Sequence, residues 1–262
     1  MRNTSSTDSS GRYAAGGVSQ APRADAEVSS LLFGIDGCPA GWYVVQASSR
    51  GSEIQGAVYG RFSDVLERAP EGSIIAIDIP IGLRSSGSRA CDHEARQALA
   101  PKRSSSVFPA PLRAVLECDN QQAASAIRRR IDGKGMSIQS FAITRKVAEV
   151  DRALEAESTC QQSVFEVHPE LSFATLNAGK PLDFPKKKSA GRAERVAILA
   201  RVFGDAPARL VSERNRKAVG ADDVLDALVG LWTAMRIYNG VSESFPAVPE
   251  RDERGRRMAI FY

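Results

Sequence analysis

The sequence contains no long apolar run. No stretch of its 262 residues approaches the roughly 18 consecutive apolar residues that a membrane-spanning helix needs. Its first thirty residues contain no apolar run flanked by a basic segment and a cleavage site, so no secretory signal is recognised. We therefore expect a cytoplasmic protein that makes no use of a membrane.

Cysteine and histidine are also scarce. The cysteines never occur at C-x-x-C spacing, which argues against a zinc knuckle and against a dithiol redox motif. With only two histidines, His93 and His168, a histidine-rich zinc or copper site is not expected. Any bound metal would therefore rest on oxygen ligands, and the expected cofactor is Mg²⁺ or Mn²⁺. The nucleotide-binding motif G-x-x-x-x-G-K-[ST] is absent as well.

Acidic residues are slightly fewer than basic residues. The formal net charge is +4 and the sequence pI is near 9.0, which is compatible with an anionic partner such as nucleic acid. Basic residues cluster at Arg128 to Arg130, Lys186 to Lys188 and Arg254 to Arg257. Each cluster can equally be a solvated surface, so charge alone does not identify the partner.

The apolar pattern divides the chain into a tail and one domain. Residues 1–29 are rich in Ser, Ala and Gly without hydrophobic periodicity, which predicts a disordered tail. From residue 31, LLFGIDG, WYVVQAS and EIQGAVYG predict a three-stranded antiparallel meander, and residues 61–69 have helical spacing. SIIAIDIPIG then reads as a buried strand that pairs in parallel with one of the first three.

The rest of the chain alternates between helical and extended patterns. Residues 89–157 are mainly helical in pattern, with a long helix whose apolar stripe runs from Ile138 to Leu154. VFEVHPE predicts a fifth strand, SAGRAERVAILARVF and DDVLDALVGLWTAMRIY predict two helices, and RMAIFY a last strand. This order favours a single α/β domain over residues 30–262, with an RNase H-like mixed five-stranded sheet, flanking helices and a helical insertion.

Aspartates stand at the positions where such a fold would bring them together. Asp36 lies in the first strand and Asp78 at the carboxyl end of the fourth, so pairing of these strands would place both side chains at one sheet end. Asp222, Asp223 and Asp226 lie within about one helical turn of each other. Adjacent carboxylates repel unless a cation or proton separates them, which favours a divalent metal, and four acids suit a two-metal phosphoryl-transfer site. Acids in the first helical turn can instead serve only as caps.

A second polar group lies in VFEVHPE. Glu166 is a candidate metal ligand, and His168 is a candidate proton shuttle or phosphate contact. The alternative is a hydrogen-bonded histidine and a capping acid at the end of a strand.

Several blocks give a family resemblance. GIDGCPAGW and IAIDIPIGL, followed in order by RACDHEAR, SSVFPAPLR, FEVHPELSFATLN and ADDVLDALVGLWTA, resemble an uncharacterised prokaryotic family of predicted RNase H-like nucleases over about residues 32–237. In the wider superfamily, which includes Holliday-junction resolvases, the resemblance assigns metal-dependent catalysis to Asp36, Asp78, Asp223 and Asp226. The resolvases carry a glutamate where this chain has Asp78. The family's other blocks imply substrate contacts at these residues: Arg89, Arg103, Ser106, Arg113, Lys146, Glu149, His168 and Lys187.

These observations favour a divalent-metal-dependent nuclease that hydrolyses phosphodiester bonds, with nucleic acid as its partner and a homodimer as a candidate assembly. One alternative is an ATP-dependent phosphotransferase of the sugar-kinase and actin type, which needs a second copy of the core. The other is a non-catalytic nucleic-acid-binding protein in which the acids are structural.

Overall fold

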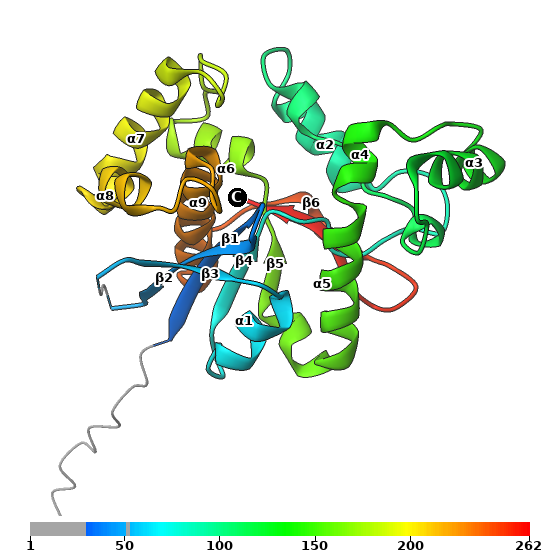
Figure 1. The fold of residues 1–262 in the computed structure, drawn as a ribbon, viewed down its shortest axis with the longest axis horizontal. Coiled ribbons are helices and arrows are strands. Elements are labelled where there is room, and N and C mark those ends of the chain that lie inside the picture. Colours follow the sequence, from blue (N-terminus) through cyan, green and yellow to red (C-terminus); the bar gives the residue numbers. More distant parts are fainter. Residues whose placement is uncertain (1–29, 51–52) are drawn as a thin grey trace, which may run out of the picture.

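The computed structural model describes residues 30–50 and 53–262, and the tail predicted for residues 1–29 lies outside this part of the chain. Its centre is a five-stranded mixed sheet with strand order β3-β2-β1-β4-β5 (Figure 1). The strands are β1 Leu31–Cys38, β2 Gly41–Ser48, β3 Gln55–Tyr59, β4 Ile74–Ile77 and β5 Val164–Glu166. The first three form the predicted antiparallel meander, and β4 and β5 run parallel to β1. The predicted α/β class with an RNase H-like mixed sheet is therefore confirmed.

Helices cover both faces of this sheet. The helices of the fold are α1 Phe62–Arg68, α2 Ala90–Ala98, α3 Gln121–Asp132, α4 Ile138–Ala142, α5 Thr144–Ala156, α6 Pro169–Leu176, α7 Ser189–Phe203, α8 Ala206–Glu213 and α9 Ala221–Tyr238. One apolar core, which includes Leu32 and Leu228, joins the sheet to α9. The other, which includes Ile35, Phe62 and Val150, joins it to α1 and α5. Among the described residues, none of the helices has the length and apolar character needed to cross a membrane.

Parallel pairing of β1 with β4 sets the positions of two acids. Ile35 of β1 lies opposite Ile77 of β4, so Asp36 and Asp78 are the next residues along the two neighbouring strands. The backbone N–H of Asp78 donates to the carbonyl of Ile35 at 3.0 Å, which continues the pairing to the end of the strands. Because side chains alternate between faces, both carboxylates share the face that carries Leu32, against which α9 packs.

Helix α9 approaches β1 unusually closely. A methyl group added at Gly34 would lie 2.0 Å from the carbonyl oxygen of Ala227 and 2.1 Å from the backbone nitrogen of Leu231. Only glycine fits this contact, because the obstructing atoms belong to the helix backbone and cannot rotate away. The contact holds the first turns of α9 beside the carboxyl end of β1, where Asp36 lies.

The structure corrects the single long helix predicted across Ile138 to Leu154. The segment forms two helices, α4 and α5, separated at Ile143, and Ile138 is 74% exposed. At the junction the hydroxyl of Thr144 donates to the carbonyl of Ser140 at 3.3 Å, a contact that competes with regular helical bonding. The buried part of the predicted stripe belongs to α5 alone.

A second, two-stranded sheet closes the fold. The predicted last strand is confirmed as β7 Arg257–Phe261, and it pairs with β6 Ser244–Arg251. Sequence reasoning missed β6 because its two prolines disfavour a strand, although an edge strand with an irregular register tolerates them. A parallel bridge from Val167 to Phe261 attaches this sheet next to β5.

We predict that Gly34→Ala lowers the free energy of unfolding by about 3 kcal/mol or more, because the new methyl group must push α9 away from β1. Urea denaturation followed by tryptophan fluorescence measures the loss. Gly60→Ala is the matched control, since a methyl group there meets no atom within 4 Å. Equal stability of the two variants would contradict the close contact.

Candidate active site

The carboxylates of Asp36, Asp78 and Asp226 converge where β1, β4 and α9 meet, and we call them the acid group. Asp36 is 9% exposed and Asp226 is 2% exposed, while Asp78 is partly buried directly after β4. Burial raises the pKa of Asp36 well above its usual range, and the negative charges of Asp78 and Asp226 raise it further. Burial likewise raises the pKa of Asp78 to about 6, with His168 lowering it and Asp226 raising it. The three carboxylates therefore act on one another as neighbouring charges.

Lys186 places a positive charge beside the acid group. Its ammonium nitrogen lies 2.6 Å from Oδ2 of Asp226. Burial raises the pKa of Asp226, and Lys186 lowers it. The acid's other oxygen, Oδ1, is buried and has no hydrogen-bond partner. Sequence reasoning recognised Lys186 only as part of a basic run and selected Lys187, which is exposed.

Asp223 has a different role from Asp226. Its Oδ2 accepts a 2.8 Å hydrogen bond from the backbone N–H of Gly220, which caps the start of α9. The cap that the sequence left open as an alternative is therefore present at Asp223. Burial still raises its pKa, and the charges of Asp222 and Asp226 add to this effect, so Asp223 lies at the margin of the acid group.

His168 stands at the edge of the acids, ahead of α6. Its Nε2 lies 3.3 Å from the carbonyl oxygen of Ser106, and its Nδ1 is buried without a partner. Its charge lowers the pKa of Asp78. Glu170, two residues further on, is 8% exposed and pairs with the fully buried guanidinium of Arg195.

The structure does not bring Glu166 to the other acids. Glu166 lies opposite Ile77 in the β4–β5 pair, and the side chain of Ile77 belongs to the core on the α5 face. Since Asp78 is the next residue after Ile77, Glu166 and Asp78 occupy opposite faces. Both oxygens of Glu166 instead accept from Arg89 at 2.7 Å, and Oε2 also accepts from the N–H of Ile81 at 2.7 Å. We treat this carboxylate as ionised and structural, because a guanidinium keeps its charge.

Most of the basic residues named as substrate contacts make internal bonds. Arg89 pairs with Asp92 and Glu166, and Arg113 pairs with Asp151 and Asp252. Arg103 donates to the carbonyl of Leu182 at 3.0 and 2.9 Å. Lys146 donates to the carbonyl of Gly41 and lies 4.2 Å from the centre of the Trp42 ring. Glu149 accepts from the indole of Trp42 and from the N–H of Phe62. In the structure these side chains join segments of the fold to one another, and Arg89, Lys146 and Glu149 bond to residues of the five-stranded sheet.

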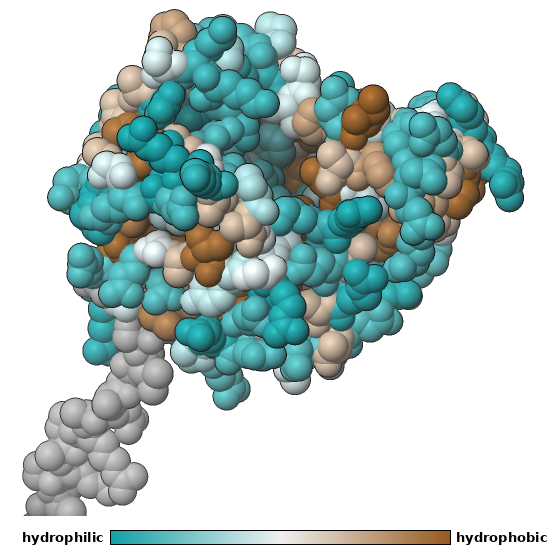
Figure 2. Space-filling view, in the orientation of Figure 1, coloured by the Kyte–Doolittle hydropathy of each residue, from teal (hydrophilic) through white to brown (hydrophobic). Residues whose placement is uncertain are grey.

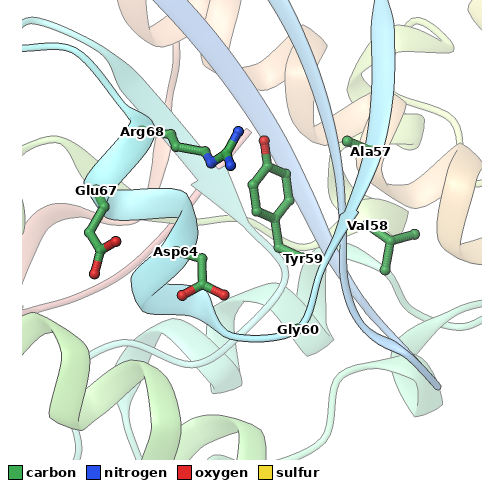
Figure 3. Close-up of a pocket in the computed structure, with 7 residues that line it drawn as sticks. All are labelled: Ala57, Val58, Tyr59, Gly60, Asp64, Glu67 and Arg68. Atoms are coloured by element: carbon green, nitrogen blue, oxygen red, sulfur yellow. The ribbon is translucent and has the colours of Figure 1, made fainter.

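The surface of the molecule has a hydrophilic hollow. Figure 2 shows a recess in the surface between the α6–α7 side and the α2 side of the molecule. Two further hollows lie elsewhere. The larger, of about 440 Å³, is lined by β3 and α1 residues that include Tyr59 and Arg68 (Figure 3). The other extends from Gly60 to Arg152. Neither is lined by a member of the acid group.

The donor set of the acids suits a hard divalent cation. Asp36, Asp78 and Asp226 offer only carboxylate oxygens, which Mg²⁺ and Mn²⁺ prefer. The Oδ1 atom of Asp226 has no hydrogen-bond partner and is free to coordinate an ion. Across residues 30–50 and 53–262, however, no three His, Cys, Asp or Glu side chains already form a coordination shell. The residues therefore fit such an ion by their chemistry, and binding requires rotation of the carboxylates towards it.

We predict that Asp78→Asn raises the melting temperature in EDTA at pH 7.5 by roughly 5 °C. The folded pKa of Asp78, about 6, exceeds the ordinary 3.8, so the native state binds more protons than the unfolded state between these values. The stability from protonated Asp78 is full below about pH 4 and is lost as the pH rises through 6. Differential scanning fluorimetry from pH 4 to 8 measures this gain, which should disappear at pH 4. A variant less stable than the wild type at pH 7.5 would contradict a cost of burying the charge of Asp78.

We predict that Arg89→Met lowers the free energy of unfolding by about 3–5 kcal/mol, because Glu166 and Asp92 would remain buried without their cation. Chemical denaturation measures the loss. Arg152→Met is the matched control, since Arg152 pairs with Glu117 at an exposed position and its removal should cost almost nothing. A stable Arg89→Met protein with weakened ligand binding would instead make Arg89 a substrate contact.

Comparison with known proteins assigns the chain to a family. No curated protein and no solved structure matches it. One family model matches residues 34–251, a span that contains most of β1, all of β2 to β5, α9 and all members of the acid group. Since this match covers most of the chain, the protein belongs to the family described as Protein of unknown function (DUF429).

Proposed function

We propose that this protein is a divalent-metal-dependent nuclease that hydrolyses phosphodiester bonds. The observation that carries the proposal is the convergence of Asp36, Asp78 and Asp226 at one end of the sheet, with Oδ1 of Asp226 buried and unpartnered. Such a cluster is costly in the absence of a cation, and costly charged groups are concentrated at functional sites. Its position at the carboxyl ends of the parallel strands β1 and β4 agrees with the usual place of active sites in α/β folds.

Each side chain has a role in this chemistry. A bound Mg²⁺ or Mn²⁺ would polarise the scissile phosphate and activate a water molecule. Asp36, Asp78 and Asp226 would hold the ion. His168 lies beside Asp78 with its buried Nδ1 unpartnered, so it can exchange a proton with the water or the leaving oxygen. Lys186 and the exposed Lys187 would neutralise substrate phosphate, which makes binding weaken as salt increases.

The sugar-kinase alternative receives less support. Its ATP site lies between two copies of the core, whereas residues 30–50 and 53–262 contain one five-stranded sheet and one two-stranded sheet. None of the three acids lines the hollow that includes Tyr59 and Arg68, so a nucleotide bound there would not contact them. A non-catalytic binding role is left as an outcome of the experiment.

We predict that Asp36→Asn reduces cleavage by at least about 100-fold, because it removes a charged metal ligand from the site. The measurement incubates single-stranded, duplex, branched and hybrid nucleic acids with Mg²⁺ or Mn²⁺ and follows product by gel. Asp205→Asn is the control, since Asp205 is exposed ahead of α8 and its side chain makes no capping bond.

Three outcomes would contradict the proposal. Equal cleavage by wild type and Asp36→Asn would remove the acids from catalysis. If the wild type cleaves nothing while a nucleotide raises its melting temperature, a kinase-like activity is favoured instead. Binding of nucleic acid without cleavage or metal uptake would leave the non-catalytic role.

A further inference from the structure

Lys186 enters the acid group from a different element than any of the acids. It lies in the segment between α6 and α7, and its Nζ is 2.6 Å from Oδ2 of Asp226. The side chain of Asp226 is 1% exposed, whereas that of Lys186 is 40% exposed. The lysine therefore extends its charged end from an accessible segment to a buried acid.

The segment that carries Lys186 is firmly attached to α7. Both oxygens of Glu194 accept backbone N–H groups, from Asp183 at 2.9 Å and Phe184 at 3.1 Å. The guanidinium of Arg195 donates to the carbonyl of Phe184 at 3.2 Å. At Gly191 an added methyl group would lie 2.1 Å from the carbonyl oxygen of Pro185. These contacts hold the residue just before Lys186 against the helix, so the position of the lysine is built into the fold.

The charge of Lys186 acts on the whole acid group. It lowers the pKa of Asp36, of Asp78 and of Asp226, and in each case it opposes the effect of burial. Arg195, the other cation that acts on Asp226, is paired with Glu170. Lys186 is thus the cation that these three acids have in common.

Counting charges gives the number of further cations that the group requires. Asp36, Asp78 and Asp226 carry −3 when ionised, and Lys186 contributes +1, which leaves −2. Glu170 also acts on Asp78 and Asp226, but its charge is balanced by Arg195, with which it pairs. Asp223 is left out of this count because its carboxylate is bound to the N–H of Gly220 at the margin of the group. One divalent ion neutralises this charge, and a second would leave an excess of +2. Lys186 contacts Oδ2 of Asp226 and leaves Oδ1 without a partner. The carboxylate can therefore contact the lysine and an ion together.

We infer that Lys186 is a permanent second cation of the site and that the site takes one divalent metal ion rather than two. This inference rests on the proposed function, since it assumes that Asp36, Asp78 and Asp226 bind the ion. The ammonium takes the place that a second metal has in two-metal sites, where it can neutralise phosphate as a point charge. The lysine also repels the bound ion, so it keeps metal affinity lower than three carboxylates alone would give.

The test measures Mn²⁺ binding directly, by isothermal titration and by electron paramagnetic resonance of free Mn²⁺, without a cleavage assay. Wild type is expected to bind one ion. Lys186→Met, which keeps the length of the side chain and removes its charge, should bind Mn²⁺ at least about tenfold more tightly, because a nearby positive charge is lost. Lys186→Arg keeps the charge and should stay within about threefold of the wild type.

Lys188→Met serves as the matched control, because Lys188 is exposed two residues away and should leave Mn²⁺ affinity unchanged. If Lys186→Met is unstable in EDTA, the rise of its melting temperature with Mn²⁺ gives the same comparison. Two ions in the wild type, or a Lys186→Met affinity equal to or weaker than the wild type's, would overturn the inference alone. No Mn²⁺ binding by the wild type at millimolar concentration would overturn the proposed function as well.

Discussion

The burial of three neighbouring carboxylates at one end of the sheet is the constraint around which this molecule is organised. Asp36, Asp78 and Asp226 are placed together by three elements distant in sequence, and burial raises the pKa of each. A core that served stability alone would replace such groups with apolar side chains. Their presence where two parallel strands end, together with one lysine held at Asp226, is what makes a cation-dependent function the best account.

Two close contacts in the fold bring these carboxylates together. Pairing of Ile35 with Ile77 aligns the residues that follow them, and the absence of a side chain at Gly34 lets α9 lie directly on β1. Neither contact involves an acid, yet both determine where the acids lie. On the opposite face, the buried pair of Arg89 and Glu166 joins α2 to β5 and leaves the acid group separate. The sheet thus divides its buried charges into a structural set and a candidate functional set.

Local patterns predicted the parts of this arrangement that depend on local physics. The alternation of Leu31 to Ser48 gives the meander, the apolar run at Ile74 to Ile77 gives a strand buried beside β1, and the periodicity of α9 carries Asp226 into the core. These features follow from side-chain period and connection handedness, which a single sequence displays.

Other parts depended on register and packing that no local pattern reveals. The face occupied by Glu166 depends on which residue of β4 it meets, and a shift of one residue would have placed it with the acids. Lys186 and Lys187 are indistinguishable by sequence, and the packing of Gly191 against Pro185 decides which one is held at the site. For the same reason Arg113 and Lys146 are interpreted from the sequence as substrate contacts, although in the structure they bond to carboxylates and a carbonyl distant in sequence.

The most direct test of the central claim is a crystal structure with Mn²⁺, located by its anomalous scattering. This account predicts one anomalous peak bounded by Asp36, Asp78 and Asp226, with the nitrogen of Lys186 still beside Asp226. An absent peak at millimolar Mn²⁺, or a peak elsewhere in the protein with these carboxylates unchanged, would contradict it.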